Sequence, residues 1–294
     1  MRRKNTEARK SFIFFTISSV CLLILSYLVV AGKAQVLSGL FESSFLIGLV
    51  VLLAIIAFSI SYYEYHGIGP QEGIIRRGPH QNIVSLTFDD GPSPTYTPQI
   101  LDILKEKGVR ASFFVVGQSV EKYPEIARRI VAEGHDIGNH TYSHRDLVPS
   151  TRKIVLNQLE KADLAIRTAT GVRTRIFRPP RGMISNAVRS LVVSKGYRII
   201  LWTTSSMDWS RISPRTILMR LKWFTRSGGI ILFHDSGALI RKEGASRGNT
   251  VQVLPMLIDY LRDIKGYEIV PVSEMLDRLG EDEFIGTEEA LENA

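Results

Sequence analysis

The stretch Leu86-Thr87-Phe88-Asp89-Asp90-Gly91-Pro92 decides how the rest of this 294-residue chain is interpreted. Residues 82–88 (NIVSLTF) are largely apolar or β-branched, which predicts a buried strand that Gly91-Pro92 ends abruptly. Two adjacent carboxylates then stand at the carboxyl end of a strand. They repel each other unless a cation neutralises one, or one is kept for proton transfer. The alternative is a solvated Asp-Asp-Gly turn, and the first interpretation requires further cation ligands downstream.

The composition fits a membrane segment followed by one domain of roughly 200 residues. The single cysteine, Cys21, excludes a disulfide framework or a cysteine metal site within one chain. The net charge of +8 is uneven, because bases crowd the first ten residues and acids crowd the stretch 280–294, which we predict to be an acidic tail. The remaining bases are scattered along amphipathic patterns and do not cluster with aromatics, so we expect no nucleic-acid partner.

Two long apolar runs precede the domain. Residues 11–32 carry no charge and follow a basic segment, 1–10, which predicts a membrane-spanning helix that starts in the cytoplasm. A cleaved signal peptide is the alternative for this run. Residues 45–63 form a second run of sufficient length. We therefore predict a membrane region at 11–63 with one or two transmembrane helices, followed by a Gly- and Pro-containing linker at 64–80.

From residue 82 onward, short β-rich runs alternate with amphipathic helical patterns. The predicted strands are 82–88, 111–116, 135–139, 175–177, 198–202, 230–233 and 267–270. The predicted helices between them are 97–107, 124–133, 154–169, 186–194, 214–225 and 251–264. This alternation indicates an α/β domain with a parallel sheet, and seven repeats favour a closed or nearly closed (β/α)7-type barrel over an open doubly wound sheet.

Polar and ionisable residues follow these strands, at positions where the carboxyl ends of barrel strands meet on one face. His140 and His144 have the i, i+4 spacing of helix-borne zinc ligands, and two histidines plus a carboxylate make a catalytic type of metal site. The alternative is a pair of surface histidines on a polar loop. The other histidines, His66, His80 and His135, are assigned no catalytic role.

Three further residues complete the candidate set. His234 follows a buried strand and suits general acid or base chemistry near neutral pH, although a lone histidine is more often structural. Asp208 offers a carboxylate that can orient His234 and raise its pKa, or it simply caps a helix. Arg178 lies between a strand and two prolines, which suits a rigid guanidinium that holds a carboxylate bidentately, or merely a tight loop.

Taken together in this order, these five pieces resemble the polysaccharide deacetylase family with the NodB homology domain, carbohydrate esterase family 4. The resemblance covers about Asn82 to Leu279, and the predicted domain is 81–279. It implies a distorted (β/α)-barrel enzyme that removes acetyl groups from N-acetylated sugars with one divalent metal ion. That ion is expected to be Zn2+, with Co2+ and Mn2+ as alternatives.

The resemblance also implies roles for the metal-binding and base residues. By position, Asp89 matches the catalytic base, and Asp90, His140 and His144 match the metal ligands. Arg178 matches the arginine that orients the base. As water attacks the acetyl carbonyl, Asp89 is expected to accept its proton.

The remaining roles concern the leaving group and the acetyl pocket. His234 matches the histidine that protonates the departing amine, and Asp208 matches the acid that tunes it. Leu232 and Trp209 match walls of the acetyl pocket and groove, and the backbone N–H of Arg181 matches a donor to the oxyanion.

The chain departs from the family pattern at two positions. Ser205 stands where many members have an aspartate, and Arg181 stands where others carry an aromatic residue. We expect both to affect substrate choice more than metal binding, because the presumed ligands are intact.

The expected partners are an N-acetylated glycan, most simply peptidoglycan or a chitin-like oligomer, and the membrane; the residues do not indicate an oligomeric state. A deacetylase of a lipid-linked sugar and a non-catalytic, membrane-anchored carbohydrate-binding homologue are the alternatives. We expect a location at a bacterial cell membrane. One span would place the domain outside the cytoplasm and two would return it, and the resemblance favours the outer side.

Overall fold

The structure, a computed structural model, describes residues 40–66, 73–210, 212–237 and 246–278. The chain forms two units, 1–66 and 67–294, and each is described by itself. The predicted basic segment, the first predicted membrane run and the acidic tail lie outside the described residues.

The described part of the first unit is the helix α2 (Leu40–His66). Many of its large apolar side chains are exposed: Ile47, Leu49, Val51, Leu52, Leu53, Ile55, Ile56 and Phe58. A search of the described residues for a helix long and apolar enough to cross a membrane found none.

The second unit is built on one parallel sheet. Its strands are β1 (Ile74–Ile75), β2 (Ile83–Asp89), β3 (Ser112–Val115), β4 (Asp136–Asn139), β5 (Ile176–Phe177), β6 (Arg198–Ile200), β7 (Thr204–Ser205), β8 (Gly229–His234) and β9 (Glu268–Ile269). Their order is β1-β6-β5-β4-β3-β2-β8-β7, with β9 beside β2. Because β1 and β7 end this order without pairing with each other, the sheet is a curled half-barrel that fits the predicted (β/α)7-type class.

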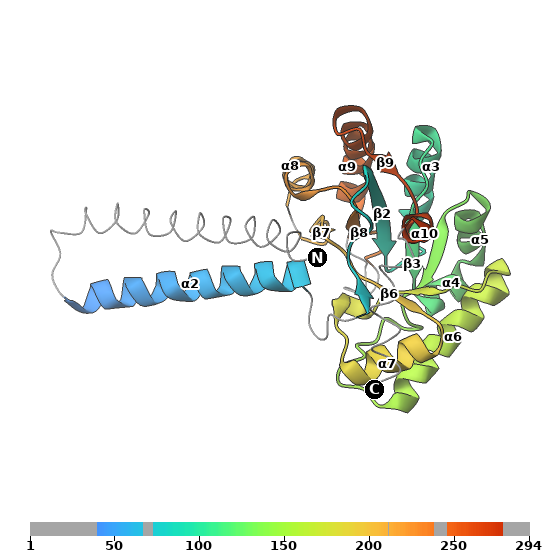
Figure 1. Cartoon of the computed structure of the whole chain (residues 1–294), viewed down its shortest axis with the longest axis horizontal. Coiled ribbons are helices and arrows are strands. Elements are labelled where there is room, and N and C mark those ends of the chain that lie inside the picture. The colour runs from blue at the N-terminus through green and yellow to red at the C-terminus, as the bar shows by residue number, and fades with distance from the viewer. Residues whose placement is uncertain (1–39, 67–72, 211, 238–245, 279–294) are drawn as a thin grey trace. The chain divides into compact units, whose positions relative to one another are not determined.

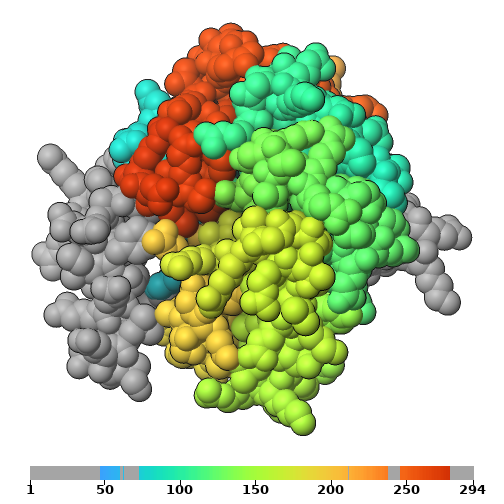
Figure 2. All heavy atoms as spheres, turned by 90° about the vertical axis from the view of Figure 1, so that its right-hand side faces the viewer, coloured from blue at the N-terminus to red at the C-terminus, as the bar shows by residue number. Residues whose placement is uncertain are grey.

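The helices lie around this sheet (Figure 1). They are α3 (Thr97–Lys107), α4 (Gly117–Lys122), α5 (Pro124–Ala132), α6 (Arg152–Thr170), α7 (Asn186–Ser194), α8 (Pro214–Phe224), α9 (Gly248–Asp259) and α10 (Val272–Asp277), with the short helices η1 (Pro180–Gly182) and η2 (Tyr260–Ile264). On the face shown in Figure 2, the green helices of the middle of the chain and the orange-red elements near its C-terminus form the surface.

Local sequence explains where several helices begin. The side chains of Thr151, Ser185 and Ser213 each accept a hydrogen bond from a backbone N–H of the first turn of α6, α7 and α8. Packing then fixes the sheet. Phe88 on β2 stacks on Phe113 of β3 and Phe233 of β8, with ring centroids 5.0 and 5.7 Å apart. The predicted stretch therefore forms the central strand of the sheet.

The predicted strands and helices correspond to β2–β6, β8 and β9, and to α3 and α5–α9. Five elements of the second unit were not predicted: β1, β7, α4, α10 and the short helix η1. Each has between two and six residues, which is too short for hydrophobic periodicity to register. β1 lies within the predicted linker and pairs with β6, so Ile74 and Ile75 belong to the barrel, which corrects that part of the linker prediction.

Candidate active site

The two adjacent aspartates sit where β2 ends, and both are buried. Asp89 is 3% exposed and Asp90 is 4% exposed. Asp90 adopts a left-handed backbone, with φ of 78°, and carboxylate oxygens of both aspartates lie within 3.8 Å of His140 Nε2. A Cβ atom added to Gly91 would lie 2.1 Å from Oδ2 of Asp235, so only glycine fits there. The Asp-Asp-Gly sequence thus forms a tight buried turn, not a solvated one.

The two predicted metal-binding histidines follow β4. His140 Nε2 lies 3.5 Å from Asp90 Oδ1, and His144 Nε2 lies 3.2 Å from the same oxygen. The three potential ligand atoms all lie within 4.8 Å of one another. The i, i+4 spacing of the pair predicted helix-borne ligands, and that prediction is wrong: Thr141 and His144 have φ of 69° and 53°, so the pair lies on a loop.

This group of side chains fits a metal ion. Oδ1 of Asp90 is buried and has no hydrogen-bond partner, which is costly unless a cation is its partner. His140 Nδ1 lies 2.7 Å from the Arg178 carbonyl, which can only accept, so this nitrogen carries the proton and Nε2 has a free lone pair. One carboxylate and two imidazoles are a donor set that suits zinc and similar transition-metal ions.

The charges around Asp90 also favour a cation. Burial opposes ionisation of Asp90, but the neighbouring imidazoles, with His140 Nε2 3.5 Å from its Oδ1, hold its pKa below the usual value. Burial and the neighbouring His140 lower the pKa of His144 to about 4, so that imidazole is neutral at neutral pH. A negative carboxylate beside a neutral imidazole is what metal ligation requires.

Two polar side chains outside the predicted set hold the histidine loop in place. Gln158 on α6 accepts hydrogen bonds from the backbone N–H groups of Tyr142 and Ser143, at 3.1 and 3.0 Å. Asn139 accepts one from the N–H of Thr141 at 2.9 Å, and its own amide donates to the Leu159 carbonyl at 3.0 Å. No sequence pattern indicates these roles, because both depend on contacts between separate segments.

Asp89 is held by Arg178, as the resemblance implied. Arg178 is fully buried, and its Nη1 lies 2.6 Å from Asp89 Oδ1. Its Nε and Nη2 donate to the carbonyls of Ile200 and Leu201, so the guanidinium is fixed at three points. The expected bidentate clasp is therefore wrong. Only one Arg178 nitrogen contacts the carboxylate, and the others anchor the arginine to β6.

His234 and Asp208 form a second pair. Asp208 accepts hydrogen bonds from His234 Nδ1 at 2.7 Å, from the His234 backbone N–H at 2.8 Å, and from Thr250 Oγ1 at 2.6 Å. Burial opposes protonation of His234, but Asp208 outweighs it and raises the pKa of His234 to about 9. His234 is thus an imidazolium at neutral pH. Thr250 is a site residue that the sequence analysis missed.

The other predicted site residues lie around these two pairs. Leu232 is buried on β8, and Trp209 is 51% exposed after Asp208. Arg181 has φ of 57°, and its Nε lies 3.4 Å from Asp146 Oδ1. Ser205 lies on β7, where its hydroxyl accepts from the N–H of Met207. Ser205 therefore has a hydroxyl that is hydrogen-bonded within its own loop, at the position where the resemblance implies a carboxylate in many family members.

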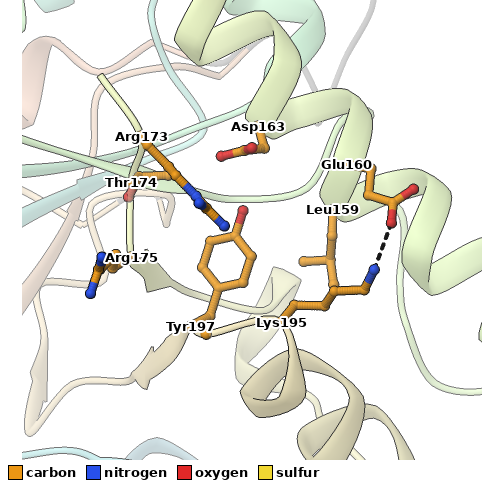
Figure 3. A pocket seen from close by; sticks show the side chains of 9 residues that line it. Leu159, Glu160, Asp163, Arg173, Thr174, Arg175, Lys195 and Tyr197 are labelled. Carbon is orange, nitrogen blue, oxygen red and sulfur yellow. Dashed lines mark hydrogen bonds and ion pairs between the residues drawn. The ribbon is translucent and has the colours of Figure 1, made fainter. Parts of the chain in front are cut away.

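A hollow of about 380 Å³ lies elsewhere, between α6 and the segments that enter β5 and β6 (Figure 3). It is lined by Leu159, Glu160, Asp163, Arg173, Thr174, Arg175, Lys195, Gly196 and Tyr197. None of the predicted site residues lines it. Two of its lining residues contact Asn139, whose side-chain amide donates to the Leu159 carbonyl at 3.0 Å and to the Tyr197 hydroxyl at 3.2 Å.

The fold and the site together define a class of protein: an α/β half-barrel with an Asp-His-His group beside an Asp–Arg and a His–Asp pair. The family described as "Polysaccharide deacetylase" matches residues 76–200. A chitooligosaccharide deacetylase of Sinorhizobium fredii is 38% identical over 192 residues, which covers 64% of this chain and 89% of that protein. A peptidoglycan-N-acetylglucosamine deacetylase of Bacillus cereus is 34% identical over 199 residues, which covers 67% and 89%. This chain therefore belongs to the polysaccharide deacetylase family.

Solved structures agree with this assignment. The Bc1960 peptidoglycan N-acetylglucosamine deacetylase superposes with a TM-score of 0.64 at 33% identity, covering 69% of this chain and 92% of that one. A similar TM-score of 0.64, at 30% identity, is found for BA3943, a CE4 family pseudoenzyme from Bacillus anthracis, covering 70% of this chain and 69% of that one. Since the fold also occurs in a pseudoenzyme, an argument for activity has to rest on the site residues of this chain.

Proposed function

We propose that this chain is a metal-dependent hydrolase that removes N-acetyl groups from amino-sugar residues of a cell-envelope polysaccharide, either peptidoglycan or a chitin-like oligomer. One observation carries the proposal: Asp90, His140 and His144 converge beside Asp89, while His234 is held as an acid by Asp208. The named activities of the related proteins, on peptidoglycan and on chitooligosaccharides, support this substrate class.

Asp90, His140 and His144 would hold the metal ion, for which Zn2+ is our first expectation. When bound, it supplies Lewis-acid chemistry, polarising an acetyl carbonyl and lowering the pKa of a water molecule. The protein contributes the proton transfers. Asp89, fixed by Arg178, accepts the proton of the attacking water. Because Arg178 Nη1 donates a hydrogen bond to Oδ1 of Asp89, Oδ2 is the oxygen that accepts the proton from water.

His234 completes the reaction by protonating the amine as the C–N bond breaks. Its Nδ1–H points at Asp208, so Nε2 is the nitrogen that can face the substrate. The products are acetate and a free amino sugar. The backbone N–H of Arg181 is the proposed donor to the developing oxyanion, and Leu232 and Trp209 are the proposed walls of the acetyl pocket and groove.

The test of this function is acetate release from acetylated chitooligosaccharides and from peptidoglycan, with metal content measured on the same samples. Asp89→Asn keeps the shape of the side chain but removes the base, so turnover should fall by at least about a hundredfold. Metal content should not change, because Asp89 is not one of the three ligands. Substantial activity in Asp89→Asn would refute the assignment of the base.

We also propose that the chain is held at the cell membrane with its domain on the outer side. This rests on the apolar runs of the sequence and on the wall polymers that the named relatives act on. A topology reporter fused after Ala294 tests it: an external signal is expected. An internal signal would contradict this location and favour a lipid-linked or intracellular substrate.

A further inference from the structure

One face of α8 combines bases with exposed apolar side chains. Arg215, Met219, Lys222 and Trp223 follow an i, i+4, i+7, i+8 spacing, so they share one stripe along the helix, and the exposed Arg226 follows two residues after the helix ends at Phe224. Trp223 is 69% exposed and Met219 is 58% exposed. The opposite face of α8 buries Ile217 and Leu221 in the core. We call these five residues the α8 stripe.

The stripe carries positive charge without compensation. Residues 214–226 contain no acidic residue. Within the described parts of the chain, no ion pair joins Arg215, Lys222 or Arg226 to a carboxylate. Lys222 Nζ instead lies 4.5 Å from the ring centroid of Tyr260, and Arg226 Nη1 lies 2.5 Å from the carbonyl of Trp223. The two exposed apolar side chains are therefore flanked by three cations.

The stripe lies away from the candidate active site. α8 lies at the outside of this unit (Figure 1) and follows the loop that carries Asp208. The chain after Trp223 leads to the amino-terminal edge of the sheet, where the N–H of Gly228 donates to the carbonyl of Ile83 at 2.8 Å. Ile83 begins the strand that ends at Asp89, so about 20 Å of strand separates this edge from the site. A glycan bound at the site has no reason to stack on Trp223.

We propose that the α8 stripe is a docking surface for an anionic lipid bilayer, with Trp223 and Met219 at the depth of the head groups and the three bases against acidic lipids. The surface of an anionic bilayer is negatively charged and has an apolar layer beneath it. It therefore complements both the bases and the exposed apolar side chains of the α8 stripe. A neutral glycan would leave the bases unexplained, and a soluble polyanion would leave Trp223 and Met219 unexplained. The helix would lie on the membrane and not cross it.

Tryptophan quenching tests this with the full chain. The protein is mixed with vesicles of brominated phosphatidylcholine, with or without phosphatidylglycerol, whose bromine atoms quench only nearby indoles. We expect strong quenching on the anionic vesicles and loss of most of it in Trp223→Phe. Trp209→Phe is the matched control, because Trp209 is also exposed, at 51%, but lies at the site. The absolute emission that Trp209→Phe loses to quenching should equal that of the wild type.

A second variant tests the charge. Arg215→Gln with Arg226→Gln should require about thirtyfold more anionic lipid for the same quenching, since each of the two bases contributes about 1 kcal/mol at such a surface. The proposal is overturned if Trp223→Phe is quenched as strongly as the wild type, or if phosphatidylglycerol makes no difference. It is also overturned if Trp223 becomes shielded with rising protein concentration in lipid-free detergent, which would indicate a second copy of the chain as the partner.

Discussion

Two neighbouring residues, Asp89 and Asp90, have separate tasks because the backbone turns between them. Asp89 is the last residue of β2 and faces Arg178, while the left-handed Asp90 faces His140 and His144. The Arg178 guanidinium holds the Asp89 carboxylate in place, and the histidines leave Asp90 with a buried oxygen that has no hydrogen-bond partner. The repulsion expected between adjacent acids is thus resolved by giving each its own positive or metal-binding partner.

The pair of His234 and Asp208 predicts a pH dependence. A raised pKa keeps His234 protonated up to about 9, so activity that needs this acid should decline as pH rises through that value. Asp90 contributes to the raised pKa of His234, and a bound metal ion would counter that contribution. The alkaline limb of the pH profile should therefore lie no higher than about pH 9. Asp208→Asn removes the largest stabilising partner of the imidazolium. It should move the limb to lower pH by one to two units, on the order of 1.4 kcal/mol per unit.

The measurement is the pH profile of kcat/KM for acetate release, with Asp208→Asn compared with the wild type. A purely structural role for Asp208 would lower activity at every pH and leave the limb in place. An unchanged limb would therefore contradict the assignment of His234 as the acid.

At this scale the sequence predicted much of the site. The residues that follow strands, and their order along the chain, identified Asp89, Asp90, His140, His144 and His234, and the structure brings these side chains together. Thr250 was missed because its hydrogen bond to Asp208 joins residues 42 positions apart. A threonine carries no chemical signal until a fold places it beside a carboxylate.

At the scale of elements, the loop that carries His140 and His144 shows that an i, i+4 spacing does not by itself determine a helix. The i, i+4 pattern fits a helix, but three supports favour a loop here. The N–H groups of Gly117 and Gln118, at the start of α4, donate to the carbonyls of Thr141 and Tyr142 at 3.0 and 2.9 Å. Gln158 receives the loop's own N–H groups from the other side. Both histidines can then reach Asp90 without a helical turn between them.

Gln158 should consequently control metal affinity without touching the metal. Gln158→Leu leaves the N–H groups of Tyr142 and Ser143 without their acceptor, so the loop loosens and the metal dissociates more readily. Residues that position metal ligands typically contribute ten- to a hundredfold in affinity, and we expect a loss of about that size. Competition with a chromogenic chelator measures it without any activity assay.

The matched control is Gln118→Leu. The side chain of Gln118 is exposed, and only its backbone N–H meets the loop, which the substitution leaves intact. Equal metal affinity in the two variants would mean that the Gln158 carbonyl is not what holds the histidines.

At the scale of the whole molecule, the half-barrel brings residues from 89 to 250 to one edge of the sheet. Alternating strand and helix patterns predicted this parallel architecture. They did not predict which strands form its edges, because β1 and β7 have only two residues each and are defined by their partners, β6 and β8. Pairing between distant segments, and not local pattern, decides where such a sheet stops.

The amino-terminal edge of the same sheet holds a buried histidine that should make folding sensitive to acid. His135, 6% exposed, accepts a hydrogen bond at Nδ1 from the N–H of Ala111 at 3.1 Å, so a proton there would place two donors face to face. Burial, with Arg110 and Arg129 nearby and only Glu133 opposing, lowers the pKa of His135 to about 4. The usual value of 6.5 applies to the unfolded chain.

Between pH 6.5 and about 4, His135 therefore binds a proton in the unfolded chain but not in the folded protein. The free energy of unfolding should be highest above pH 6.5 and should decrease as pH falls through this range, by up to about 3 kcal/mol from this group. His135→Asn keeps an acceptor near Nδ1 and cannot titrate, so denaturation of the full chain at a series of pH values should show a shallower decline than in wild type. His80→Asn, at an exposed position, should decline as the wild type does, and parallel curves for all three proteins would exclude His135 as the acid-sensitive group.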